Sequence, residues 1–199
     1  MIKIVNFSKN TNDEFLNNKL YKFMTTNLKG TIFNTLGFNF FCKNILYNDL
    51  VDLFYDKQDE DVRLLIIYIN YENERKLTRK ILFHLLKNPH QIILKFYFLL
   101  SKFFYHKTME YDLSTIQLLT LIIDREYYKK KISLDLRDKT IDNFHQAYVK
   151  KKQATKIIAS FPIKNVAAAK YYSRNNFNIF FKNKLYNFIE KKYGNVNKY

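Results

Sequence analysis

The chain has 199 residues, with 34 lysines and arginines against 18 aspartates and glutamates, giving a formal net charge of +16. Hydrophobic residues make up 47% and aromatic residues 18%, which excludes a disordered chain and allows a sizeable core. The only cysteine, Cys42, excludes an internal disulfide bond and lies in an apolar run typical of a buried small side chain.

The first third of the chain predicts a strand, a helix and a β-hairpin. Ile2–Phe7 alternates between apolar and polar residues, as a half-buried strand does. Asn12 or Asp13 then precedes an apolar pattern of helical spacing, in the position of an N-cap. Two apolar runs follow, Leu50–Tyr55 and Val62–Asn70, and the polar link between them predicts a hairpin.

The middle of the chain predicts two helical segments between Tyr71 and Lys107, divided at Pro89 because proline disfavours helix in the residue before it. The most apolar stretch, residues 91–104, is too short and too charged to span a bilayer. The N-terminal residues lack the apolar core of a signal peptide. We therefore expect a cytoplasmic protein.

The last part of the chain predicts two strand–helix pairs and a final strand or pair of strands. Leu118–Ile123 is apolar throughout, which indicates a central strand. No linker or internal repeat interrupts the chain, so we expect a single domain over residues 1–199. The predicted elements cover residues 118–123, 132–148, 154–161 (ended by Pro162), 165–175 and 178–193.

The positive charge is concentrated near the C-terminus. Residues 124–199 carry 18 cationic against six acidic side chains, a net charge of +12, whereas residues 1–123 carry +4. This asymmetry favours an anionic partner for the C-terminal third. A phosphorylated coenzyme, a nucleic acid or an anionic membrane surface would satisfy it, and a solvated basic surface without a ligand is the alternative.

The order strand, basic loop, helix, strand, helix over residues 116–177 resembles the coenzyme A-binding half of the GCN5-related N-acetyltransferase (GNAT) family. The helix at Asn165 also carries the family pattern Asn-x-x-Ala…Tyr. The resemblance implies an α/β (α+β) fold, with a mixed, mostly antiparallel twisted sheet flanked by helices. Residues 71–107 would then be a helical insertion between the third and fourth strands.

The resemblance implies that acetyl-CoA or another acyl-CoA is the co-substrate, and that the acyl group passes to an amine such as an amino sugar or another small metabolite. The family's pyrophosphate loop usually reads Arg or Gln, two residues, Gly, one residue, then Gly or Ala. Tyr128, Lys131 and Ser133 hold those positions here, so the loop is degenerate. The cofactor-binding residues so implied are Leu121, Ile122 and Ile123 for the pantetheine, Tyr128, Lys129, Lys130, Lys131, Ile132 and Ser133 for the pyrophosphate, and Asn165 and Ala168 on the second helix.

The lysines of this loop have two possible consequences. Lys129 and Lys131 either turn outward and add positive charge beside the phosphates, or obstruct the cradle with their Cβ atoms. Cations at a helix N-terminus are unfavourable unless an anion offsets them, so Lys129, Lys130 and Lys131 together favour an anionic ligand over a merely solvated turn.

Tyr172 occupies the position that the family gives to the general acid, and the resemblance implies that its hydroxyl protonates the departing thiolate. Packing in a helix–sheet seam is the alternative role for this tyrosine. Tyr171 lies about 100° away around the helix, so the two cannot point to one site. Asn176 stands where the family has Gly, and asparagine is the residue that most readily replaces Gly in a left-handed turn.

No general base is evident in the sequence. Gln117, at a strand position where some relatives have Glu, cannot accept a proton. Glu110 and Asp112 precede that strand and are candidates by proximity, and a water chain is a further route. The four histidines show no metal-binding spacing, so we expect no metal site.

A second hypothesis keeps the fold without catalysis. In that case the basic C-terminal third would hold nucleic acid, an anionic glycan or a membrane surface. For the enzyme we expect a small-molecule amine acceptor and no specific nucleic acid, and peripheral contact with a membrane stays open.

Overall fold

The computed structural model describes residues 2–7, 13–27, 46, 51–58, 61–87, 114–184 and 186–194. The elements are β1 (Ile4–Asn6), α1 (Glu14–Asn27), β2 (Asp52–Gln58), β3 (Asp61–Asn70), α4 (Tyr71–Lys87), β4 (Thr115–Ile123), α6 (Arg125–Lys131), α7 (Leu134–Lys151), β5 (Lys156–Pro162), α8 (Val166–Arg174), β6 (Asn178–Lys182) and β7 (Tyr186–Lys192).

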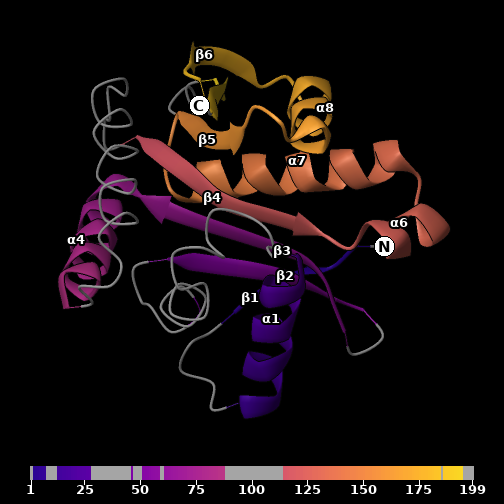
Figure 1. Cartoon of the computed structure of the whole chain (residues 1–199). Coiled ribbons are helices and arrows are strands. Elements are labelled where there is room, and N and C mark those ends of the chain that lie inside the picture. Colours follow the sequence, from indigo (N-terminus) through magenta and orange to yellow (C-terminus); the bar gives the residue numbers. More distant parts are fainter. Residues whose placement is uncertain are drawn as a thin grey trace.

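The strands form one seven-stranded sheet in the order β1-β2-β3-β4-β5-β7-β6 (Figure 1). Every neighbouring pair is antiparallel except β4 and β5, which run parallel. This arrangement confirms the predicted mixed, mostly antiparallel sheet and the central position of β4. It also brings the N-terminal hairpin and the C-terminal strands into one sheet.

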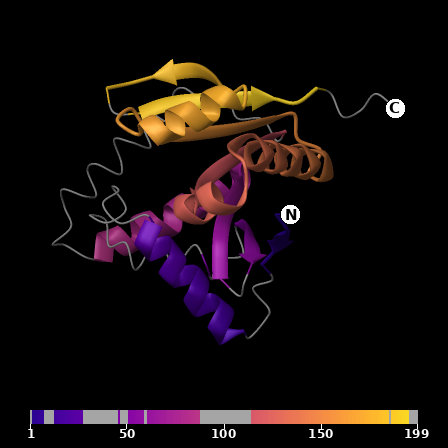
Figure 2. The same cartoon turned by 90° about the vertical axis from the view of Figure 1, so that its right-hand side faces the viewer.

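Helices cover both faces of this sheet. Leu20 and Met24 of α1 and Leu77 of α4 pack in one apolar cluster with side chains of β2 and β3. Tyr128 of α6 and Ile141 of α7 belong to a second cluster on the opposite face, together with the tyrosines of α8. Seen from the side in Figure 2, α7 and α8 lie above and α1 below. The core is therefore two apolar layers divided by the strands.

Most predicted elements are confirmed, with one correction in the hairpin. The link between the two hairpin strands is shorter than predicted because β2 continues to Gln58. Asp56 was expected in that link, but it is a fully buried strand residue. Its carboxylate accepts hydrogen bonds from the Tyr128 hydroxyl at 2.5 Å and from the Lys3 amide at 3.3 Å, so core contacts hold it in the strand.

The predicted cap at the start of the first helix is confirmed, and a second helix has a cap that was not predicted. The Asp13 carboxylate accepts from the Leu16 amide at 2.9 Å at the start of α1. Asn165 caps α8. Asn176, which follows α8, has φ of 59°, the left-handed conformation predicted for it.

The region after β4 differs from the prediction. A basic loop was expected between β4 and the next helix, but most of it forms the separate helix α6, which ends at Ile132 in extended backbone. The physical reason is local, since the Asp124 carboxylate caps this helix at the Tyr127 amide.

Several sequence predictions lie outside the described residues. These are the surroundings of Cys42, the second half of the predicted insertion after residue 87, and the candidate bases Glu110 and Asp112. Within the part that is described, α4 confirms the first helix of the insertion, and no helix has both the length and the apolar character needed to cross a bilayer.

Candidate active site

The two parallel strands β4 and β5 separate partway along their length. They pair from Thr115 with Lys156 to Leu118 with Ala159, and beyond that point they are not paired with each other. We call the separated arms, Leu119–Ile123 of β4 and Ser160–Pro162 of β5, the β4–β5 fork. The inner backbone edges of such a fork can hydrogen-bond to a ligand, because buried amides and carbonyls need partners.

A β-bulge lies where the fork opens. The pairing of β4 with β3 passes from Leu118 opposite Tyr68 to Thr120 opposite Ile67, which leaves Leu119 without a partner in β3. A bulge of this kind bends its strand and increases its twist, so it directs β4 away from β5. This break in register carries no pattern in the sequence, and our sequence analysis missed it.

The residues predicted to hold a pantetheine lie on the β4 arm of the fork. Leu121, Ile122 and Ile123 pair with β3 on their outer edge and have no strand partner among the described residues on the edge that faces β5. The Ile122 side chain is buried in one apolar cluster, and those of Leu121 and Ile123 are partly buried against the other, so a ligand at this edge would meet mainly backbone groups.

Tyr128, predicted at the pyrophosphate, points into the core. Its hydroxyl donates to buried Asp56 at 2.5 Å. Burial raises the pKa of Tyr128 well above its usual value, and the hydrogen bond to Asp56 raises it further. Asp124 anchors the same helix by an ion pair with Arg63 at 2.8 Å. The position that the family uses for a phosphate contact thus fastens α6 to the sheet in this chain.

The amides predicted to face phosphates are only partly available. Those of Lys129–Lys131 lie within α6, and the Ile132 amide donates to the Tyr128 carbonyl at 3.0 Å. At the start of α7, the Leu136 amide donates to the Ser133 hydroxyl at 3.3 Å. The amides of residues 133–135 have no hydrogen-bond partner among the described residues, so the available group lies further along the chain than we predicted.

The lysines of this region have separate environments. Lys129 pairs with Glu126 at 3.4 Å, and both side chains are largely exposed, so the pair contributes little to stability. Lys130 is exposed beside it, and the side chain of Lys131 lies outside the described part of the structure. Asp135 lies in the first turn of α7, where its carboxylate is favourable to the helix dipole. That carboxylate would compete with a bound phosphate for the same amides.

The predicted residues of α8 lie at its two ends. Asn165 is exposed, and its side-chain oxygen accepts from the Ala168 amide at 3.1 Å. Tyr172 stacks on Phe161 of the β5 arm, with ring centroids 5.4 Å apart, and contacts Phe177 edge-on at 5.0 Å. These aromatic contacts bring the Tyr172 ring against the fork.

The two neighbouring tyrosines differ in what their hydroxyls contact. The Tyr172 hydroxyl has no hydrogen-bond partner among the described residues, and burial raises its pKa. The Tyr171 hydroxyl faces Nε2 of His145 on α7 at 3.5 Å. Only Tyr172 therefore offers a protonated hydroxyl that the protein does not already use.

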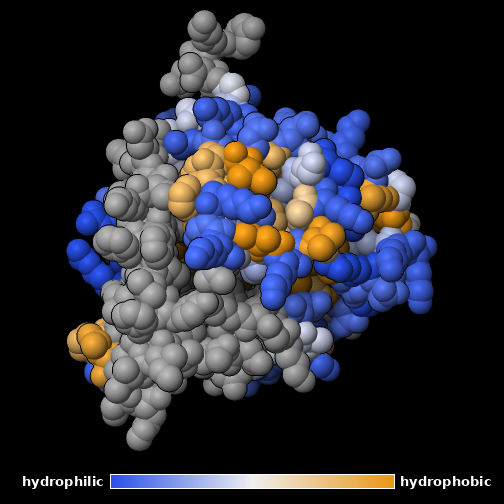
Figure 3. All heavy atoms as spheres, turned by 45° about the horizontal axis from the view of Figure 1, so that its top comes forward, coloured by the Kyte–Doolittle hydropathy of each residue, from blue (hydrophilic) through white to orange (hydrophobic). Residues whose placement is uncertain are grey.

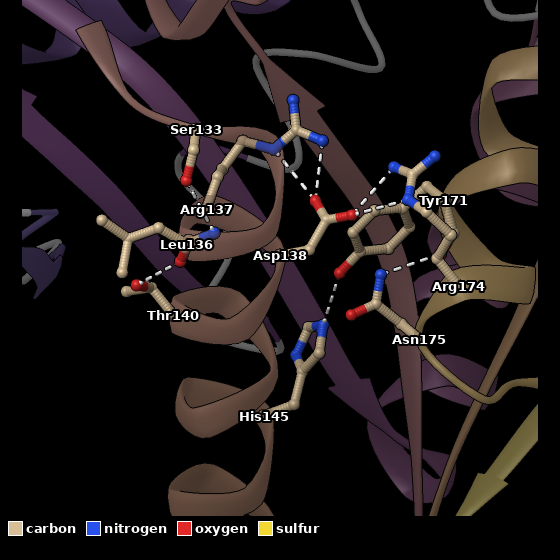
Figure 4. Close-up of polar contacts among 9 residues, drawn as sticks. All are labelled: Ser133, Leu136, Arg137, Asp138, Thr140, His145, Tyr171, Arg174 and Asn175. Carbon is tan, nitrogen blue, oxygen red and sulfur yellow. Dashed lines mark hydrogen bonds and ion pairs between the residues drawn. The ribbon is translucent and has the colours of Figure 1, made fainter.

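A buried carboxylate joins α7 to α8. One oxygen of Asp138 accepts from Nε and Nη2 of Arg137, at 3.0 and 2.7 Å, and the other from Nε and Nη2 of Arg174, at 3.1 and 2.8 Å (Figure 4). We call these three residues the Asp138 clamp. The two arginines satisfy both carboxylate oxygens, and Arg174 comes two residues after Tyr172. The sequence gives no sign of this pairing, because Arg174 is 36 residues from Asp138.

His145 provides a second connection in the same seam. Its Nδ1 contacts the Tyr68 hydroxyl of β3, and its Nε2 faces Tyr171. Burial lowers the His145 pKa to about 4, so the imidazole is neutral at pH 7. Residues on both sides of Tyr172 are thus held to α7.

No proton acceptor is evident at the fork among the residues that the structure describes. Gln117 is buried on β4, and its side-chain oxygen has no hydrogen-bond partner among them. An amide cannot act as a base at neutral pH. Over the residues that the structure describes, no group of three histidine, cysteine or acidic side chains could hold a metal ion.

Comparisons with known proteins establish the fold. No family model and no curated protein matches the chain. Among solved structures, the PaiA N-acetyltransferase from Thermoplasma acidophilum in complex with coenzyme A matches at 15% identity and TM-score 0.54, over 97% of this chain and 99% of that one. A GNAT-family acetyltransferase from Staphylococcus aureus Mu50 matches at 15% identity and TM-score 0.55, over 96% and 99%. Aminoglycoside 6'-acetyltransferase type Ii matches at 11% identity and TM-score 0.56, over 96% and 97%.

These matches extend over 96–97% of this chain. The chain has the fold of the GNAT acetyltransferases, which confirms the fold class inferred from its sequence.

Proposed function

We propose that this protein is a coenzyme A-dependent N-acyltransferase that moves an acetyl or other acyl group from the thioester to an amine. The observation that carries the proposal is the β4–β5 fork, which opens at the Leu119 bulge. The Tyr172 ring packs on the β5 arm of this fork, and its hydroxyl has no partner among the described residues. The likeness in fold to acetyltransferases, one of them in complex with coenzyme A, supports it.

In this proposal the residues of the fork and of the α7 N-terminus hold the acyl-CoA. The backbone of Leu121–Ile123 binds the pantetheine arm, and Asn165 and Ala168 border it from α8. The free amides at Ser133–Asp135 face the pyrophosphate, with Lys129 and Lys130 adding positive charge nearby. The thioester supplies an activated acyl carbon.

Tyr172 then acts as the general acid. The amine nitrogen bonds to the acyl carbon, the carbon–sulfur bond breaks, and the Tyr172 hydroxyl protonates the sulfur. The phenolate left at Tyr172 then regains a proton from water, as its raised pKa favours. The proton lost from the amine passes to water, because no carboxylate or imidazole is available at the fork among the described residues. The raised pKa of Tyr172 keeps it protonated before the reaction.

The acceptor is proposed as a small-molecule amine. The likeness in fold to an aminoglycoside 6'-acetyltransferase makes amino sugars the first class to test. Simple primary amines and polyamines should be tested alongside them, because the described residues show no carboxylate at the fork that selects one amine.

Titration calorimetry with coenzyme A and acetyl-CoA tests the first step of this function. Saturable binding, followed by release of free thiol when an amine is added, is the expected result. The absence of binding at millimolar coenzyme would contradict the proposal.

The second candidate is a non-catalytic protein with this fold, and the α6 region is the observation that favours it. Tyr128 and the α6 amides are used within the protein, and the carboxylate of Asp135 adds negative charge to the first turn of α7. Coenzyme binding without turnover over the amine panel would support this candidate. Tight binding of one nucleic-acid sequence at physiological salt would also support it, because non-specific binding falls steeply with salt.

A further inference from the structure

The outward face of α4 combines positive charge with large exposed apolar side chains. This helix buries Glu74 and Leu77 against the protein. Successive residues of an α-helix are about 100° apart around its axis, so the residues on the opposite side fall within an arc of about 120°. We call this the α4 stripe, and it consists of Lys76, Arg79, Lys80, Phe83, Leu86 and Lys87.

The apolar side chains of the stripe are unusually exposed. Phe83 is 62% exposed and Leu86 is 69% exposed, one turn apart on the same side of the helix. Lys87 places its ammonium 4.8 Å from the centre of the Phe83 ring. In Figure 3 hydrophobic atoms project from the left margin, the side on which Figure 1 shows α4. Isolated exposed apolar residues are ordinary, but a neighbouring pair flanked by cations is typical of a membrane-surface helix.

The charge of this face is not balanced within the described protein. The stripe carries four cations, and Glu72 is the one carboxylate of α4 in the same arc, which leaves +3. None of the four cations forms an ion pair with a described residue. Each of these cations would therefore add to the attraction between this face and an anionic surface.

We propose that the α4 stripe is a docking surface for anionic phospholipid membranes, with Phe83 and Leu86 entering the headgroup region. Charge complementarity selects this partner. In a two-fold contact with a second copy of the chain, the stripe would face the same net charge of +3, and the two surfaces would repel each other. Residues 88–113, which follow α4, carry three lysines against two carboxylates and do not complement the stripe either. A nucleic acid would satisfy the cations, but Leu86 has no ring on which a base could stack.

Vesicle co-sedimentation of the full chain tests this surface without reference to catalysis. We expect sedimentation with vesicles that contain phosphatidylserine, little with pure phosphatidylcholine vesicles, and release as salt is raised. Lys80→Ala should weaken binding about fivefold, the scale of one cation near an anionic membrane. The double variant Phe83→Ala, Leu86→Ala should weaken it about tenfold or more by loss of apolar burial.

The chain offers a matched control on another helix. Phe15 of α1 is also 62% exposed and has Lys19 four residues later, 4.1 Å from its ring centre. Phe15→Ala makes the same chemical change and should leave vesicle binding unchanged. An equal loss in this control, or no binding of the wild type to acidic vesicles, would overturn the proposal. So would dimers that the double variant dissociates in the absence of lipid, or RNA binding that depends on Lys80 but not on Phe83 and Leu86.

Discussion

The two sides of the candidate coenzyme site differ in how they use their residues. On the α8 side, the residues that match the family pattern make local contacts only, and one hydroxyl is available for catalysis. Asn165 caps the helix, Asn176 makes the left-handed turn, and Tyr172 has a hydroxyl without a partner among the described residues. On the α6 side, Tyr128 is bonded in the core and Lys129 is paired on the surface.

The difference shows that residues on one side of a candidate site can serve packing, as Tyr128 does, while a residue on the other side, Tyr172, keeps its hydroxyl available. On the α6 side, where the sequence predicted a phosphate cradle, the structure has a helix anchored to the sheet at Asp56 and Arg63. The backbone amides without a partner among the described residues lie at the α7 N-terminus, and Asp135 stands in the same first turn. We therefore expect most of the catalytic effect on the α8 side and most of the stability effect on the α6 side.

The largest expected effect concerns Tyr172. Tyr172→Phe keeps the stacked ring and removes only the hydroxyl, so turnover should fall about 10²–10⁴-fold, the contribution of general acid catalysis. Tyr171→Phe loses a long contact to His145 and serves as the matched control, with turnover close to wild type. Measured rates of thiol release from acetyl-CoA check this. If Tyr171→Phe alone abolishes turnover, the assignment of the acid is wrong.

A second test removes the charge at the centre of the Asp138 clamp. Asp138→Asn leaves two guanidiniums facing a neutral amide, and breaking a buried ion pair costs about 3–5 kcal/mol. We expect a loss of about 3 kcal/mol in the free energy of unfolding, measured by urea denaturation. Asp135→Asn, an exposed carboxylate on the same helix, should change stability by less than about 0.5 kcal/mol.

Tyr128 separates a structural role from a binding role on the α6 side. Tyr128→Phe removes a hydrogen bond to the buried Asp56 carboxylate, so unfolding should become easier by about 1.5–3 kcal/mol. Coenzyme affinity of the folded variant should match wild type in calorimetry. A tenfold weaker affinity with intact folding would restore Tyr128 to the phosphate site.

His145 makes the α7–α8 seam sensitive to acid. Its folded pKa of about 4 lies below the usual value of 6.5, so the unfolded chain binds the extra proton first as pH falls. The stability that the neutral imidazole contributes is therefore present above about pH 6.5 and is lost progressively toward pH 4. Between pH 7 and pH 5 the loss should be about 2 kcal/mol.

Denaturation curves at those two pH values measure this loss, with His145→Gln as the comparison. The variant lacks the titrating ring and should show a smaller change over the same interval. An equal change in both proteins would mean that other groups cause the pH dependence.

The sequence predicted much of the fold because its strongest signals are local. The apolar run of β4, the hairpin of β2 and β3 and the cap at Asp13 each depend on residues close together in the chain. The prediction of a loop after β4 was wrong, because residues 125–131 form the helix α6. The Asp124 cap is a local signal for α6, and the family resemblance implied a loop in its place.

What the sequence determined by itself was the order of the strands and of the helices α1, α7 and α8, the cap at Asp13 and the left-handed turn at Asn176, since cap bonds and backbone preferences span three or four residues. The tertiary structure decided where the fork opens, where Tyr128 points and which arginine meets Asp138. These contacts join residues separated by 72 positions for Tyr128 and Asp56 and by 36 for Asp138 and Arg174. They depend on strand register and helix packing, which come into being only when distant segments meet.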